Sequence, residues 1–175
     1  AKKTGARLHV FHLSTAKELE LFSNKLPLKE KKITCEVCIH HLTFSDQDYD
    51  KLGSKIKWNP AVKTSNDRAK LWDALNNDLI DVIATDHAPH TAEEKQNPYI
   101  SCPSGGPLVQ HSLVSMLEAY HQQKISLEKI VQKMCHNPAI LFDVSKRGFV
   151  QEGFYADLVI FDIKSPWKVS NDNLI

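Results

Sequence analysis

The stretch LIDVIATDHAPH, residues 79–90, decides the fold because it begins with an almost unbroken apolar run of strand length. Such a run suggests a strand that is buried on both faces, as in a parallel sheet covered by helices. Asp86 follows this run directly, and His87 and His90 come within the next four positions. In parallel α/β folds, catalytic and binding residues collect at the carboxyl ends of the strands. These polar residues are therefore the first candidates for a functional site.

Two earlier segments, RLHVFHL (7–13) and KITCEVCI (32–39), also have the length and composition of strands. Thr15 and Glu18 stand at capping-box spacing and predict the start of a helix, and Ser65 is expected to cap another. Strands that alternate with helices indicate βα units on a parallel sheet. The fold class is therefore α/β, and either a doubly wound sheet or part of a (β/α) barrel would fit.

The second half of the chain is predicted to be mainly helical until the tail. A helix is expected from Pro107 to about Gln123, and Ser126 should cap a further helix that ends near Cys135. Residues 148–162 differ, because glycines stand at turn positions and apolar residues alternate with a period of two. That pattern predicts a β segment after the helices.

Composition excludes several classes of protein. The formal net charge is +1 over 175 residues, which gives no electrostatic reason to expect binding to nucleic acid or to a membrane surface. No apolar run approaches the ~20 residues that span a bilayer. Glycine-rich phosphate loops and the G-x-S-x-G nucleophile motif are absent from the sequence. We therefore expect a small-molecule partner, with no role for nucleic acid or membrane.

The sequence contains four cysteines, of which Cys35 and Cys38 form a C-x-x-C. This pair could suit a zinc knuckle or a redox centre, but residues three apart on a strand face opposite ways and no second pair exists. Packing is the favoured interpretation. Four unpaired thiols fit a reducing compartment, and the cytoplasm is the expected location.

Each of the three predicted strands ends in histidine or aspartate: His12, then His40 and His41, then Asp86. Histidine and carboxylate side chains that meet at one edge of a sheet suit a divalent metal such as zinc. A single strand-end histidine is more often structural, but the recurrence favours a ligand role for His12. An unpaired buried carboxylate costs several kcal/mol, and a metal would relieve this cost at Asp86. The same carboxylate could carry a proton during hydrolysis.

Three further features could contact a substrate. His90 lies on a loop fixed by Pro89 and could offer a donor to a carboxylate. Asn59 precedes a proline, so it could present its amide to a planar group or could simply open a turn. The segment CPSGGP (102–107) supplies small residues and backbone N–H groups, although a plain flexible loop is the alternative.

These motifs resemble those of the dihydroorotases, a family of cyclic amidohydrolases. Their second signature is Asp-x-Ala-Pro-His followed by Lys, which this chain matches at Asp86, Ala88, Pro89, His90 and Lys95. The blocks HVFHLST, EVCIHHL, KWNPAVKTSNDRAKLWDAL, PSGGP and GFYADLVIFD are similar to those of the family in the same order. The resemblance covers essentially the whole chain.

The resemblance implies the carboxyl-terminal part of a (β/α)8 TIM-type barrel, about strands 6 to 8 with their helices. Residues 1–147 would be the partial barrel with post-barrel helices, and residues 148–175 a returning β segment of a small accessory domain. The implied activity is zinc-dependent, reversible cyclisation of N-carbamoyl-L-aspartate to L-dihydroorotate in pyrimidine biosynthesis. Two zinc ions per intact site and a homo-oligomer are expected.

The resemblance also implies roles for single residues. His12 would be a metal ligand, and Asp86 would be both a metal ligand and the general base and acid. The substrate-binding positions would be Asn59, His90, Ser104 and Gly105, the last two acting through their backbone. The family usually has proline before the paired histidines, where this chain has Ile39. We therefore leave His40 and His41 out of the expected site.

The family's His-x-His pair, bridging lysine or aspartate, and further histidine cannot be located in the sequence. Residues 1–5 also read like the end of a helix. The expectation is an incomplete fragment, inactive when isolated. One alternative is another cyclic amidohydrolase, such as a hydantoinase or allantoinase, against which His90 argues. A second is a catalytically inactive scaffold subunit, which the joint presence of Asp86, His90 and Asn59 disfavours.

Overall fold

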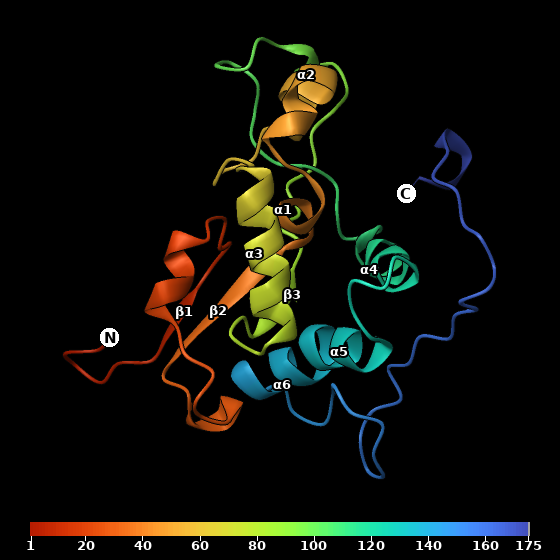
Figure 1. Cartoon of the computed structure of the whole chain (residues 1–175). Helices are drawn as coiled ribbons and strands as arrows, with labels where there is room; N and C mark the ends of the chain where they lie inside the picture. Colours follow the sequence, from red (N-terminus) through yellow and green to blue (C-terminus); the bar gives the residue numbers. More distant parts are fainter. Residues whose placement is uncertain (175) are drawn as a thin grey trace.

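The structure is a computed structural model, and it describes residues 1–174. Its centre is a three-stranded parallel sheet in the order β1 (Leu8–Val10), β2 (Ile33–Cys38) and β3 (Val82–Ala84), shown in Figure 1. Val10 lies opposite Cys35, and Cys38 lies opposite Ala84. The parallel α/β arrangement that the sequence predicts is therefore confirmed, and the carboxyl ends of all three strands lie at one edge of the sheet.

The helices are short except for two. In chain order they are α1 (Ile39–Thr43), α2 (Tyr49–Leu52), α3 (Ser65–Asn76), α4 (Ser112–His121), α5 (Leu127–Val131) and α6 (Asn137–Leu141). In Figure 1, α3 crosses the sheet, α5 and α6 lie near the amino ends of the strands, and α2 lies beyond their carboxyl ends. No helix within residues 1–174 is long and apolar enough to cross a membrane.

The main core forms between β2 and the helices that cover the sheet. Cys35 and Val37 on β2 are fully buried, and Leu71 and Leu75 bring the apolar side of α3 onto them. Burial of one such leucine side chain contributes about 1.5–3 kcal/mol. Because β2 is the central strand and is buried along almost its whole length, it fixes the positions of the two strand ends beside it.

A buried ionic cluster ties the amino ends of the strands together. Asp81, directly before β3, accepts hydrogen bonds from the Lys31 ammonium at 2.6 Å and from the Cys35 N–H at 3.0 Å. Lys133 is 1% exposed and donates to the Ile80 carbonyl at 2.6 Å. Burial lowers the pKa of Lys133. These contacts join β2, β3 and the segment that follows α5.

Asp81→Ala is expected to lower the free energy of unfolding by about 3 kcal/mol, because the buried Lys31 ammonium loses its anionic partner and keeps only the Asp78 carbonyl. The matched control is Asp73→Ala, which removes an exposed pair with Lys70 at 3.6 Å. This control should lower the free energy of unfolding by less than about 1 kcal/mol. Urea unfolding of the full-length protein that contains these residues measures both. Equal midpoints for the two variants would contradict the importance of the cluster.

The expected β segment after the helices is not formed. Between residues 148 and 174 the structure has turns and extended chain but no strand, and Ile175 lies outside the described residues. Val159 and Ile160 are largely exposed. An extended segment becomes a strand only when a neighbour pairs with it over several residues, and within residues 1–174 the tail makes only isolated backbone contacts, such as that of the Tyr155 N–H with the Lys146 carbonyl. The proposed division at residue 148 stays a prediction.

Several helix boundaries also differ from the sequence prediction. The capping box that starts α3 joins Thr64 to Asp67, so Thr64 rather than Ser65 is the cap. Thr15 and Glu18 do form reciprocal hydrogen bonds, but only a 3-10 turn follows. The helix expected at Pro107 begins five residues later, because the Leu108 and Val109 N–H groups donate to the His87 ring instead.

Ser126 caps α5 as predicted, since its side chain accepts a hydrogen bond from the Lys129 N–H. The helical run does not end near Cys135, however. It continues through a π-helical turn, Gln132–His136, into α6, where Pro138 occupies the first turn. Proline is tolerated there because its missing N–H would have no partner within the helix.

Candidate metal and substrate site

His12 and Asp86 come together at the carboxyl edge of the sheet. Each lies two residues beyond its strand, and the His12 Nε2 atom is 3.5 Å from the Asp86 Oδ1 atom. Both residues have left-handed backbone conformations, with φ of 57° and 47°. This conformation costs residues other than glycine about 1–2 kcal/mol, and such strain is concentrated at functional sites. The fold therefore holds the two side chains face to face at a local energetic cost.

Glu36 fixes the orientation of the His12 ring. This buried carboxylate on β2 lies 2.9 Å from His12 Nδ1 and 3.1 Å from His9 Nε2. The Cys38 sulfur is also 3.1 Å from His12 Nδ1, but that nitrogen carries at most one proton. The Cys38 contact has hydrogen-bond geometry, whereas the Glu36 contact is a charge contact. Because a carboxylate anion stabilises a nearby N–H, we place the ring proton on Nδ1. The Nε2 lone pair is then free to face Asp86.

The His12 and Asp86 donor atoms fit a zinc ion. Tetrahedral zinc holds nitrogen and oxygen ligands at about 2.0–2.2 Å, which places two ligands about 3.4 Å apart. The observed 3.5 Å between Nε2 and Oδ1 agrees with this spacing. A carboxylate behind a ligating histidine, such as Glu36, is the usual support for such a site. Burial and the charges of Glu36 and Asp86 raise the pKa of the Cys38 thiol, which favours its neutral form.

His40 and His41 are buried beside Cys38, and their side chains could also form a group with metal-ligand spacing. Burial lowers the pKa of His40 to about 2, and its ring stacks on Trp58 with centroids 4.3 Å apart. His41 Nε2 lies 3.0 Å from the Pro60 carbonyl oxygen. Within residues 1–174, neither His40 ring nitrogen has a hydrogen-bond partner. Both rings stay neutral, and they pack beneath the Asn59 segment.

The residues expected to bind substrate lie on three loops that contact one another. His90 Nε2 is 3.0 Å from the Ser104 carbonyl oxygen, and its Nδ1 is 3.5 Å from a Glu94 carboxylate oxygen. The Gly105 N–H donates to the Lys57 carbonyl at 2.9 Å, which brings the loop next to the segment that contains Asn59. Asn59 itself is exposed. The structure thus brings together His90, Ser104 and Gly105.

Gly105 is required where two of these loops cross. Its φ is +118°, and a Cβ atom there would lie 2.6 Å from both the Cβ and the carbonyl oxygen of Ala88. A Cβ on Gly106 would lie 2.6 Å from the Trp58 ring. Backbone approaches backbone at this point because neither residue has a side chain.

Glu36 and Lys95 are the two residues in this region to which the sequence alone assigns no role. A signal existed for Glu36, since it is a lone charged residue in the apolar run TCEVC. Burial of an unpaired carboxylate is costly, so a partner such as His12 could have been anticipated. Lys95 belongs to the signature, but its contacts involve main-chain atoms that no sequence pattern specifies.

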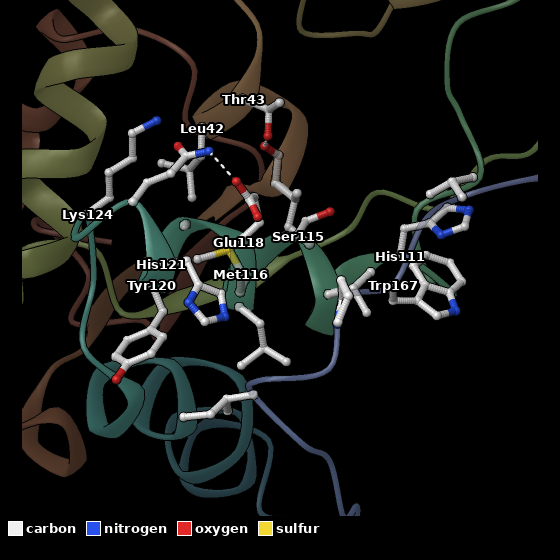
Figure 2. Close-up of a pocket in the computed structure, with 18 of the residues that line it drawn as sticks. Leu42, Thr43, His111, Ser115, Met116, Glu118, Tyr120, His121, Lys124 and Trp167 are labelled. Atoms are coloured by element: carbon white, nitrogen blue, oxygen red, sulfur yellow. Dashed lines mark hydrogen bonds between the residues drawn. The ribbon is translucent and has the colours of Figure 1, made fainter.

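A further hollow lies away from these side chains. A cavity of about 1090 Å³ separates α4 from residues 162–169, and neither His12 nor Asp86 lines it. Figure 2 shows His111 and Trp167 close together at one end of this cavity and His121 and Tyr120 toward the other. The tail spans the hollow as extended chain. We attach no chemistry to it.

Comparison with known proteins gives a consistent result. The chain is 39% identical over 178 residues to a dihydroorotase of Carboxydothermus hydrogenoformans, covering all of this chain and 41% of that protein. It is 34% identical over 174 residues to a dihydroorotase of Clostridioides difficile, covering 98% of this chain and 40% of that protein. The chain therefore spans about 40% of the length of these curated relatives.

Solved structures share its fold. An L-hydantoinase (dihydropyrimidinase) from Arthrobacter aurescens superposes with a TM-score of 0.79 at 29% identity, covering 89% of this chain and 35% of that one. A dihydroorotase from Saccharomyces cerevisiae, in complex with 5-fluoroorotic acid, superposes with a TM-score of 0.71 at 17% identity, covering 79% of this chain and 39% of that one. These neighbours place the partial α/β structure in the superfamily of TIM-type barrels. Because the model of the Amidohydrolase family matches residues 2–174, the chain belongs to that family.

Proposed function

We propose that the protein containing this chain is a dihydroorotase, which reversibly closes N-carbamoyl-L-aspartate to L-dihydroorotate in pyrimidine biosynthesis. The observation that carries the proposal is the 3.5 Å approach of His12 Nε2 to Asp86 Oδ1 at the strand ends. Identity of 34–39% to curated dihydroorotases supports the choice of substrate. In this proposal, β1, β2 and β3 correspond to barrel strands 6, 7 and 8. A cytoplasmic homo-oligomer is the expected form.

His12 and Asp86 would hold zinc. When bound, the metal polarises a carbonyl group and lowers the pKa of water. Catalytic zinc usually has three protein ligands, so the other ligands of a two-zinc site would come from outside these residues. The contribution of Glu36 is to keep the proton on Nδ1 of His12, so that Nε2 is available to the metal.

The proposed task of Asp86 is proton transfer. In the hydrolytic direction, its carboxylate accepts a proton from the attacking water and delivers it to the ring nitrogen that leaves. In cyclisation the transfer runs in reverse. A carboxylate serves both directions because it accepts a proton as a general base and then gives it up as a general acid.

The substrate would lie beside the three contacting loops. Asn59 and the backbone of Ser104 and Gly105 would hold the planar ring, and His90 would face the carboxylate. His90 Nε2 donates to the Ser104 carbonyl, so Nδ1 would donate to the ligand only in the imidazolium form, in which both ring nitrogens carry a proton. That nitrogen is 3.5 Å from Glu94, whose side chain is 53% exposed. Such a long, solvated contact is weak enough for a substrate carboxylate to replace.

A cyclic amidohydrolase acting on hydantoins or dihydropyrimidines is the second candidate. The superposition with the L-hydantoinase structure at a TM-score of 0.79 favours it. The two candidates differ in whether the ring carries a carboxylate, so His90 is the residue whose role would differ between them.

Purified full-length protein tests the proposal. The assays compare hydrolysis of dihydroorotate, hydantoin and dihydrouracil, together with cyclisation of carbamoyl-aspartate and zinc content by elemental analysis. We expect dihydroorotate to be preferred by kcat/KM and zinc to be bound. Preference for hydantoin or dihydrouracil would establish the second candidate. No turnover of any ring with zinc bound would support an inactive scaffold subunit and overturn the proposal.

Glu36→Gln is expected to weaken zinc affinity or activity by about 10–100-fold, because the ring of His12 loses its anionic support. Chelator competition measures the affinity directly. The matched control is Glu18→Gln, because Glu18 also accepts backbone hydrogen bonds close to His12 in the sequence but does not contact the His12 ring. Unchanged zinc affinity in the Glu36 variant would contradict this assignment.

A further inference from the structure

Lys95 is a buried cation whose three donors all have main-chain acceptors. The ammonium lies 3.1 Å from the Lys57 carbonyl oxygen, 3.0 Å from that of Pro103 and 2.9 Å from that of Gly105. It also lies over the Trp58 ring, 5.7 Å from the centroid. An ammonium group has three N–H donors, so this set satisfies it completely without a carboxylate. Buried lysines are rare, which makes such an arrangement noteworthy.

Three consecutive carbonyl groups of one loop are held by a single neighbouring segment. Pro103 and Gly105 accept from Lys95, while the Ser104 carbonyl between them lies 3.0 Å from His90 Nε2. His90 and Lys95 stand on either side of a turn in which Thr91 and Glu94 hydrogen-bond reciprocally. The signature that begins at Asp86 therefore fixes the path of residues 103–105 through its side chains.

Fixing these carbonyl groups also fixes the N–H groups that follow them. In a planar trans peptide, the N–H points opposite to the preceding C=O. Because the Pro103 carbonyl faces Lys95, the Ser104 N–H points away from it. Among residues 1–174 the Ser104 N–H has no acceptor, whereas the next N–H, that of Gly105, is taken by the Lys57 carbonyl. Ser104 thus presents an unused donor on a constrained loop.

We propose that Lys95 is a positioning residue that holds the 103–105 backbone so that the Ser104 N–H can donate to an oxygen of the bound ligand. This inference rests on the proposed function, in which the ligand is a ring with carbonyl and carboxylate oxygens. Lys95 itself does not touch the ligand. Its effect passes through the Pro103 and Gly105 carbonyl groups, and Gly105 also packs closely against Ala88.

Lys57 provides a matched control on the same loop. Its ammonium contacts the carbonyl oxygens of Tyr99 at 2.6 Å, Ile100 at 3.2 Å and Cys102 at 2.6 Å. Like Lys95, Lys57 donates to three carbonyl groups, but these belong to residues 99–102 and not to residues 103–105. Replacing the Lys57 side chain leaves its own carbonyl in place. A general loss of loop support would affect both lysine variants equally, whereas positioning of Ser104 requires Lys95.

The test compares Lys95→Met with Lys57→Met in the full-length protein. Hydrogen–deuterium exchange of peptides covering residues 99–108 reports loop order without any substrate, and kinetics with dihydroorotate report ligand binding. For Lys95→Met we expect faster exchange across residues 103–106, because the loop carbonyl groups lose their hydrogen bonds to the charged ammonium. KM should rise about tenfold, because the Ser104 N–H is then no longer held toward the ligand. Its kcat should stay within about threefold, because ground-state binding is what is lost. For Lys57→Met, KM should change less than about threefold.

Unchanged exchange in Lys95→Met, or an equal rise of KM in both variants, would overturn the inference. If Lys95→Met does not fold, Lys95→Gln replaces it, since an amide still donates to two of the three carbonyl groups. A smaller rise in exchange and KM is then expected, and wild-type values for both would refute the positioning role. If the wild-type protein does not process dihydroorotate, the proposed function fails, while the exchange comparison still decides whether Lys95 orders the loop.

Discussion

Asp86→Asn should lower kcat of the full-length protein at least about 10³-fold, because the amide cannot take up and return a proton and binds metal less well. The fold should survive, since asparagine tolerates the left-handed conformation that Asp86 adopts. Steady-state cyclisation of carbamoyl-aspartate, with thermal unfolding beside it, measures both effects.

Asp143→Asn is the matched control for this prediction. Asp143 is also an aspartate with positive φ, at 51°, but it is exposed and lies two residues after the end of α6. The same change of atoms in the same kind of backbone should leave kcat unaltered. Activity within about tenfold of wild type for Asp86→Asn would remove this residue from the role of proton carrier.

The isolated 175-residue chain should show no turnover and should not bind two zinc ions. His12 and Asp86 are two of the ligands that the proposed site requires, and a catalytic zinc usually needs three protein ligands. The sheet also has three strands only, so β1 and β3 each lack a partner on one edge. Elemental analysis and the cyclisation assay on the purified chain provide the measurement.

Full-length protein, prepared in the same buffer, is the control for that experiment. Stoichiometric zinc together with turnover by the 175-residue chain would show that the described residues already form a complete site. That result would contradict the need for further ligands and would require His40, His41 or Cys38 to bind metal after all.

Sequence patterns were sufficient for the sheet but not for the ends of the helices. The apolar runs at 7–13, 32–39 and 79–85 predict all three strands, because burial on both faces leaves a signal that depends on composition alone. Helix starts depend on which of several possible caps forms its hydrogen bonds. At α3 the box that forms uses Thr64, one residue before the predicted cap, and at α4 the His87 ring delays the first turn.

The tail shows a different limit. Its alternating apolar pattern resembles a strand, but pairing requires a neighbour, and a pattern cannot supply one. The site itself was partly accessible to sequence reasoning. That His12 and Asp86 would approach each other follows from parallel topology, whereas the carboxylate of Glu36 behind His12 and the carbonyl contacts of Lys95 depend on side-chain directions in three dimensions.

The ionic cluster around Asp81 lies at one end of the strands, and His12 and Asp86 lie at the other. The stabilising ion pairs and the side chains proposed to react therefore lie at opposite ends of the same sheet. Substitutions around the carboxyl ends of the strands could therefore change which ring is accepted, while the Asp81 cluster at the amino ends keeps the strands in register. Conversely, stabilising substitutions around Asp81 could raise the unfolding temperature without moving the side chains that are proposed to contact the substrate.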